Sequence, residues 1–599
     1  MIHKPDLTLP EQKIASLSFC ETSPKAFESW VKGLPMANLG EASRQLYHGI
    51  IELNQLIAQP QQRFQLLELI RPRIIFVCRE LARHFLGLSV SLPEKQRKVA
   101  NLSQALQLHL AAGYKTCLCE ALDNGSPDKH RKLIITAAHR IISELGATIL
   151  RANQLYCPAP INSWLECHRV FRFASRNRLH TTPVSDSALM HRRENTVADA
   201  YHRVILLGCA RPNQLRQNEL KQAYQLFEVW TEQIRCSADI ASNALFVANM
   251  EQDAPPVYRS LLQEQITSDY FGIDTTVIAR QIAEHLNGRD TDSQLPALAM
   301  PIAASETLLT HLRQALGTLT ERSFRRIASE GTLQVSVGLT ATHYFVAGEK
   351  QFNEFVAGGQ PLAIDNEENR FLSHSRRRND PWSGAHDAGA SDDILRAADT
   401  PINYRGGAGS GNNEPERRNQ PRFYRTRLVD TSPGGYCIRW GSDLPTSLQS
   451  GEILAVREQD SHPWSIALVR WIRQLRHQGT QVGLELLAPS ASPCAVRLIQ
   501  KTGQGSEFLR GILLPEEVDN HQGPTVITPR MPFQEGSRIT LLQGGREDQG
   551  QLSRRIAATG SISQFELKLF NQGDKTGQIG SASPGGTSED EFDSLWPSL

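Results

Sequence analysis

Residues 428–440 read LVDTSPGGYCIRW, and this stretch decides the fold of the second half of the chain. Two runs of β-branched, apolar and aromatic residues flank a Ser-Pro-Gly-Gly segment, which favours two strands joined by a tight turn. Similar runs follow in GEILAVRE (451–458), WSIALVRWIR (464–473) and QVGLELLAP (481–489). Several short strands at this spacing predict a small antiparallel β-barrel.

A strand further upstream belongs to the same predicted barrel. In TLQVSVGLTATHYFVAG (332–348), apolar residues alternate as in a half-buried strand, at Leu333, Val335, Val337 and Leu339. Residues 351–420 are rich in Gly, Asn, Asp, Arg and Ser, and they cannot bury enough apolar area to offset the entropy lost on ordering. We therefore predict one barrel from residues 318–350 and 421–492, interrupted by a disordered insertion. The closure cost of such a loop rises only logarithmically with its length.

The N-terminal half has a different period. Apolar residues recur three and four positions apart, as on one face of a helix, for example at Leu46, Ile50, Leu53 and Ile57. We predict a helical domain over residues 1–310, built of antiparallel helices with short connections. A small β-rich domain is expected over 503–572, and a disordered acidic tail over 573–599. The predicted fold class is multidomain, with an all-α half, an antiparallel β-barrel and a small C-terminal β unit.

Composition argues against several classes of function. The 599 residues carry a formal net charge of +1, which disfavours a dedicated nucleic-acid binder or a polybasic membrane binder. No stretch has the ~20 apolar residues of a membrane span, and the N-terminus lacks a signal-peptide core, so we expect a cytoplasmic protein. Among ten cysteines the one close pair is Cys117 and Cys119. Its spacing fits neither a zinc site nor a disulfide framework, so we expect reduced thiols and no metal.

Two short motifs lie in and near the predicted barrel. The quoted stretch contains Asp-x-Ser-x-x-Gly, formed by Asp430, Ser432 and Gly435. The segment RSFRR (322–326) contains Arg-x-x-x-Arg, formed by Arg322 and Arg326 with Arg325 as a further donor. Together with LVRWIRQLRHQGTQVGLELL (468–487), these motifs resemble the PilZ domain, a bacterial β-barrel that binds cyclic di-GMP. The resemblance covers about residues 320–490 and implies cyclic di-GMP as the ligand of the six named residues.

The chemistry of these residue types agrees with such a ligand. A guanidinium is planar and permanently charged, so it forks onto the O6 and N7 atoms of guanine or onto phosphate oxygens. Asp430 would accept hydrogen bonds from guanine N–H groups, Ser432 would offer its hydroxyl, and Gly435 would allow a close approach. Taken singly, the same residues also make an ordinary turn between strands and a solvated basic patch.

A second arginine pair is an alternative to Arg322 and Arg326 as the ligand-binding arginines. Arg418 and Arg422 also fit Arg-x-x-x-Arg and come just before the strand that leads to Asp430. In PilZ domains the arginines precede the first strand of the barrel, and this order favours Arg322 and Arg326.

The sequence predicts a receptor and not an enzyme, because it contains no phosphate-binding loop, no nucleophile elbow and no Gly-Gly-Asp-Glu-Phe run. The resemblance implies cyclic di-GMP signalling without a further cofactor, in motility or surface attachment. We expect an unidentified protein partner to bind the helical half or the acidic tail, where Phe592, Leu595 and Trp596 lie among acids. The alternative is an interaction scaffold whose barrel binds no nucleotide.

Overall fold

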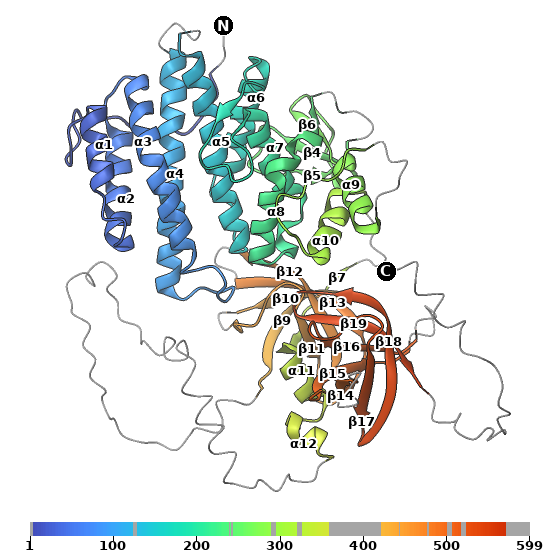
Figure 1. Ribbon diagram of the computed structural model, residues 1–599. Coiled ribbons are helices and arrows are strands. Elements are labelled where there is room, and N and C mark those ends of the chain that lie inside the picture. Colours follow the sequence, from blue (N-terminus) through green and yellow to red (C-terminus); the bar gives the residue numbers. More distant parts are fainter. Residues whose placement is uncertain are drawn as a thin grey trace, which may run out of the picture.

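The computed structural model describes residues 4–123, 129–238, 240, 244–288, 295–319, 326–358, 421–441, 444–475, 479–499, 506–516 and 523–570. A helical region forms one side of the molecule, and two β-barrels form the other (Figure 1). This arrangement confirms the predicted fold class, a helical half followed by antiparallel β-barrels.

The apolar periodicity of the first half produces a stack of helices. They are α1 (Pro24–Gly33), α2 (Leu39–Gln55), α3 (Pro60–Ala82), α4 (Glu94–Asp123), α5 (Arg131–Gln154), α6 (Ser163–Arg176), α7 (Val197–Cys209) and α8 (Gln217–Trp230). Local signals set their ends, since the Ser23 hydroxyl caps α1 and Thr196 forms a capping box with Asp199 on α7.

Helix α5 is the core of this region and packs against α4, α6, α7 and α8. It has the length and apolar composition of a membrane-spanning helix, but 78% of its most apolar window is buried inside the protein. A helix that is hydrophobic on all sides is expected at the centre of a large helical core. All ten cysteines are free, and seven of them are buried, five in the helical region and one in each barrel.

The helical region also contains a small antiparallel sheet that the all-α prediction did not include. Its strands, in the order β3-β6-β4-β5, are β3 (Arg235–Ser237), β4 (Phe246–Asn249), β5 (Val257–Tyr258) and β6 (Tyr270–Asp274). Helices α9 (Thr276–Asn287) and α10 (Glu306–Leu316) follow the sheet. Strands of two to five residues are too short for alternation to distinguish them from loops.

The first barrel closes through antiparallel pairs in the order β8-β9-β10-β13-β12-β11, and β11 returns to β8. Its strands are β8 (Thr332–Val337), β9 (Tyr424–Ser432), β10 (Gly435–Trp440), β11 (Ile453–Arg457), β12 (Ser465–Leu475) and β13 (Gly479–Ala488). A short strand, β7 (Ile327–Ala328), adds to the edge of β9.

The predicted first strand extended to Leu339, whereas β8 ends at Val337. Leu339 does not continue β8 but begins helix α11 (Leu339–Val346), because Gly338 adopts a φ of 93° that turns the chain out of the strand. Helix α11 then packs on the outside of β8 and β11. A second short helix, α12 (Phe352–Val356), lies within the predicted insertion, so its first residues are ordered, contrary to prediction. Residues 359–420 and the predicted tail 573–599 lie outside the described residues.

The helical region covers one end of the first barrel. Tyr156, which follows α5 at a φ of 55°, and Val90 pack into the same buried cluster as Trp440 of the barrel interior. The side-chain amide of Gln474 in β12 donates to the carbonyls of Val90 and Leu155, at 2.7 and 3.0 Å, and its backbone N–H donates to the Tyr156 carbonyl. A displacement of β12 therefore acts directly on the end of α5.

The second barrel is also closed, in the order β14-β15-β16-β19-β18-β17. Its strands are β14 (Ser492–Leu498), β15 (Leu509–Leu514), β16 (Thr525–Pro529), β17 (Arg538–Gln543), β18 (Arg546–Ala558) and β19 (Ile562–Leu569). Outward-facing residues of both barrels share a core with Phe345 of α11. Arg216 of the helical region donates to the Ser450 carbonyl at 2.8 Å and the Ser561 hydroxyl at 2.9 Å, so all three parts of the protein meet there.

Candidate ligand-binding site on the first barrel

Pairing of β7 with β9 brings Arg326 next to the Asp-x-Ser-x-x-Gly motif. Ile327 lies opposite Thr431 and Ala328 opposite Asp430, although about a hundred residues separate the two strands in sequence. Arg326, directly before β7, donates from Nη1 to Oδ1 of Asp430 at 2.7 Å. The exposed fractions are 31% for the arginine side chain and 24% for the aspartate side chain. The ion pair is therefore open to a ligand from the solvent side.

Ser432 and Gly435 form the turn between β9 and β10. The Ser432 hydroxyl donates to the Gly435 carbonyl at 3.3 Å. Gly435 has a φ of 147°, and a Cβ there would lie 2.1 Å from the Leu484 carbonyl oxygen of β13. Glycine is therefore required at this position for β10 to lie against β13, whether or not a ligand binds.

Strand register places the motif on the outer face of the barrel. Cys437 lies opposite Asp430, and opposed residues of an antiparallel pair point to the same face. The neighbouring Ile438 and Trp440 are buried in the interior cluster, so Cys437 points outward. Burial and the nearby Asp430 carboxylate raise the pKa of the Cys437 thiol to about 11. A neutral thiol therefore lies beside the ion pair at physiological pH.

The same outer face carries residues that the sequence interpretation missed. Gly483 of β13 lies opposite both Cys437 and Trp471, so a row of outward positions runs from Asp430 to Trp471. The Trp471 indole covers Gly483, where a Cβ would lie 2.0 Å from its Nε1. Trp471 lies on the same outer face as Asp430, three strands away, and its partly exposed indole can stack against a planar base.

Arg439 adds a second cation to this face. It lies opposite Arg427 on β9 and Gln481 on β13, and its buried Nε has no hydrogen-bond partner among the described residues. In the sequence it was one arginine in an alternating strand and gave no separate signal.

The predicted arginines have different outcomes. Arg326 is brought to Asp430, whereas Arg322, Arg325 and Arg418 lie outside the described residues. Arg422 precedes β9 and its Nε donates to the Tyr424 hydroxyl at 3.0 Å. Eight residues of extended chain, roughly 26 Å, separate it from Asp430. The geometry therefore associates Arg326, and not Arg422, with Asp430. The ligand role of the predicted residues stays a prediction.

A closed antiparallel barrel with an arginine before its first strand and an Asp-x-Ser-x-x-Gly turn on its outer face defines the PilZ class of domain. The model of the middle PilZ domain of the cyclic-di-GMP receptor FimW matches residues 245–493. The models of that receptor's N-terminal domain and C-terminal β-barrel domain match residues 25–241 and 494–570. The chain belongs to the cyclic-di-GMP receptor FimW family. These models divide the chain near residue 243, ahead of our predicted boundary at 310, and so place β4 to β6 with the PilZ domain.

One curated relative shows the extent of the similarity. The cyclic-di-GMP receptor FimW of Pseudomonas aeruginosa is 39% identical over 607 residues, which cover 99% of this chain and 98% of the relative. No solved structure matches the chain. The relative's name is that of a receptor and does not describe an enzyme.

Proposed function

We propose that this chain is a cytoplasmic receptor, and not an enzyme, that binds cyclic di-GMP on the outer face of the first barrel. The observation that carries the proposal is the half-exposed Arg326–Asp430 ion pair at the Asp-x-Ser-x-x-Gly turn. A ligand with phosphates and guanine edges can take the place of Asp430 beside Arg326 and the place of Arg326 beside Asp430. The guanidinium can fork onto guanine O6 and N7 or onto phosphate oxygens, and the carboxylate can accept from guanine N–H groups.

The outer face provides the remaining contacts of such a site. Trp471 would stack against a guanine, and the unpartnered Nε of Arg439 would add positive charge near the phosphates. Arg322 and Arg325 belong to the same arginine segment and would extend the clamp around the ligand.

The signal would pass from the barrel to a protein partner. Gln474 in β12 holds the end of α5, three residues from Trp471 in the same strand, so ligand-induced movement of β12 would reach the helical region. A ligand shifts the equilibrium between two positions of β12 only by the difference between its affinities for them. Motility or surface attachment is the regulated process that we propose.

Calorimetric titration of the full chain with cyclic di-GMP tests the proposal. Arg326→Ala and Asp430→Ala should each weaken binding at least about ten-fold, which corresponds to the loss of one charge-assisted contact. Trp471→Ala should weaken it by a similar factor. Arg422→Ala is the matched control and should bind like the wild type.

Two outcomes would redirect the proposal. A wild-type chain that does not bind cyclic di-GMP would favour the scaffold, whose barrel keeps the Arg326–Asp430 pair closed as a structural contact. A loss of binding with Arg422→Ala but not with Arg326→Ala would assign the ligand-binding role to Arg418 and Arg422.

A further inference from the structure

A large cleft lies in the helical region, away from the barrels. It has a volume of about 1220 Å³ and is lined by α1, α3, the first turns of α5 and residues 182–185. Helix α5 begins at Arg131, which lines the cleft, and ends at Gln154. Figure 1 shows that α5 runs toward the barrels. The helix spans about 36 Å at 1.5 Å per residue, so this cleft is separate from the site on the first barrel.

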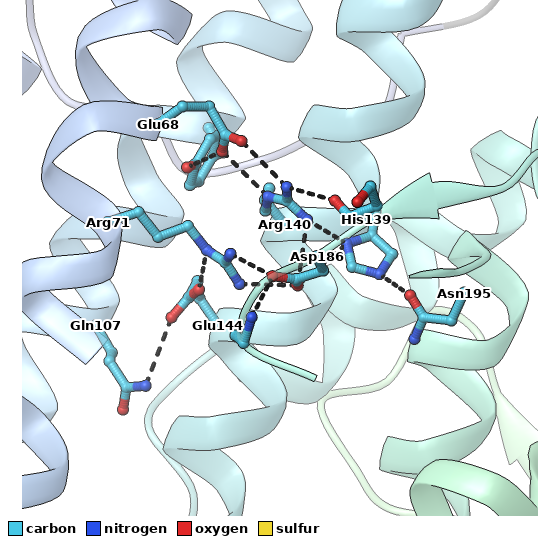
Figure 2. A network of polar contacts seen from close by, with 11 residues as sticks. Glu68, Arg71, Gln107, His139, Arg140, Glu144, Asp186 and Asn195 are labelled. Atoms are coloured by element: carbon cyan, nitrogen blue, oxygen red, sulfur yellow. Dashed lines mark hydrogen bonds and ion pairs between the residues drawn. The ribbon is translucent and has the colours of Figure 1, made fainter. Parts of the chain in front are cut away.

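The back wall of the cleft is a buried network of ion pairs, which Figure 2 shows. Arg140 of α5 lines the cleft and pairs with Glu68 of α3 at 3.1 Å. Behind it, Asp186 forms ion pairs with Arg140 at 3.1 Å and with Arg71 at 2.6 Å, and Arg71 also pairs with Glu144 at 2.8 Å. This network ties α3, α5 and the 182–186 segment together, so the wall of the cleft is held in place without a ligand.

The rim of the cleft is basic. Four exposed cations line it: Lys25, Lys129, Arg131 and Lys132. No ion pair is recorded for them within the described part of the chain, whereas the two acids of the lining are taken, Glu28 by Lys32 and Glu68 by Arg140. The N-terminal end of α5 adds its partial positive charge at the same place.

The inner lining is partly apolar, with Phe64, Leu69 and Val184 among its members. A basic rim above an apolar lining matches an acidic peptide that carries several apolar side chains. Recognition of an amphipathic helix in a groove requires anchors spaced by three and four residues.

The chain itself contains a peptide of this kind, EDEFDSLW (589–596). Its four acids are complementary to the four rim cations, and Phe592, Leu595 and Trp596 have the spacing i, i+3 and i+4. The segment lies outside the described residues. Residues 571–588 separate it from the end of β19 and span at most roughly 60 Å when fully extended.

We propose that residues 589–596 bind in this cleft, with the apolar anchors on the lining and the acids toward Lys25, Lys129, Arg131 and Lys132. Attachment to the same chain makes this binding intramolecular, with an effective concentration set by the length of the 571–588 linker. This inference does not rest on cyclic di-GMP binding.

A labelled peptide of residues 583–599 is the probe, and fluorescence anisotropy is the measurement. The acceptor is the full chain carrying Phe592→Ala, Leu595→Ala and Trp596→Ala, which leaves the cleft vacant. The peptide should bind this chain and bind the wild type at least about ten-fold more weakly, because the wild-type segment competes. A peptide of the same composition in scrambled order should also bind at least about ten-fold more weakly, because its anchors lose their spacing.

Charge reversals locate the contact. Lys129→Glu, Arg131→Glu and Lys132→Glu together should abolish binding. The matched control reverses Lys95, Arg97 and Lys98, three exposed cations in the first turns of α4, and should leave binding unchanged. All six positions are exposed, and circular dichroism checks that both variants fold; Lys25→Glu on α1 is a second, milder variant.

Three outcomes would overturn the proposal. They are no binding of the peptide to the vacant chain, equal weakening by the α5 and α4 reversals, and equal binding to the vacant and wild-type chains. The second would show general charge attraction, and the third would show that the segment does not occupy the cleft.

Discussion

The helical region and the first barrel each join an arginine to a carboxylate from a distant part of the chain, but they expose the pair to different degrees. Arg71 and Asp186 are 4% and 3% exposed, whereas Arg326 and Asp430 are 31% and 24% exposed. A buried pair cannot exchange its partner without leaving an uncompensated charge, so it acts as a cross-link. A half-exposed pair gains little from its own attraction and can exchange a partner for a ligand.

The largest expected effect is the loss of the buried network. Asp186→Ala removes the acceptor shared by Arg71 and Arg140 and should lower the free energy of unfolding of the helical region by about 3–5 kcal/mol. Urea unfolding followed by circular dichroism at 222 nm measures the change. Asp123→Ala, which breaks an exposed pair with Lys4, is the control and should change it by less than about 1 kcal/mol. Equal effects would mean that burial does not distinguish the pairs.

The next effect is a loss of stability in acid. Burial, helped by Arg140, lowers the pKa of His139 to about 4, and burial also lowers that of His168 to about 4. Unfolded histidine titrates near 6.5, so as the pH falls from about 6.5 to 4 the unfolded chain takes up protons that the folded chain does not. Each histidine should cost up to about 3 kcal/mol over this window.

Urea unfolding at several pH values measures this loss. Although burial opposes it, Arg71 lowers the pKa of Asp186 to about 2, below its unfolded value, so this carboxylate adds to the loss only below about pH 5. The loss between pH 6.5 and about 5 comes from the histidines. His139→Gln should flatten the pH dependence. A stability that stays constant from pH 7 to 4.5 would contradict the assignment of both histidines as buried and neutral.

A smaller effect tests the turn of the candidate site. Gly435→Ala would place a Cβ 2.1 Å from the Leu484 carbonyl oxygen and should destabilise the first barrel by about 2–3 kcal/mol, with a lower melting temperature. Gly331→Ala, where no atom lies within 4 Å of the added Cβ, is the matched control and should change little. If the two variants melted alike, the required glycine would be explained by the ligand and not by the contact of β10 with β13.

Much of the fold could be predicted because its elements are long or strongly patterned. Runs of β-branched, apolar and aromatic residues between turns identified β9 to β13, and the helical period identified the first half. The failures have local physical causes. Alternation from Ala467 and Val469 would put Trp471 inside the barrel, but the register of β12 shifts between Val469 and Trp471, so the indole lies outside over Gly483.

The candidate site was predictable in part. The turn from Asp430 to Gly435 is local in sequence, so its motif could be recognised. The convergence of Arg326 on Asp430 depends on the pairing of β7 with β9 across the long insertion, which no sequence period encodes. The buried network was not predictable at all, because Arg71, Glu144 and Asp186 are single charges in unrelated segments.

The smallest expected effect concerns the exposed pair itself, and a double-mutant cycle measures it. Arg326→Ala, Asp430→Ala and the double variant should give a coupling free energy of less than about 1 kcal/mol for unfolding of the ligand-free chain, because solvent screens the attraction and both side chains lose rotamer entropy. In the proposed receptor, the same cycle on cyclic di-GMP affinity should be strongly non-additive, since one ligand replaces both partners. A coupling free energy of unfolding above about 2 kcal/mol would show instead that the Arg326–Asp430 pair stabilises the fold, as Arg71–Asp186 does. A ligand would then have to break this stabilising ion pair in order to bind.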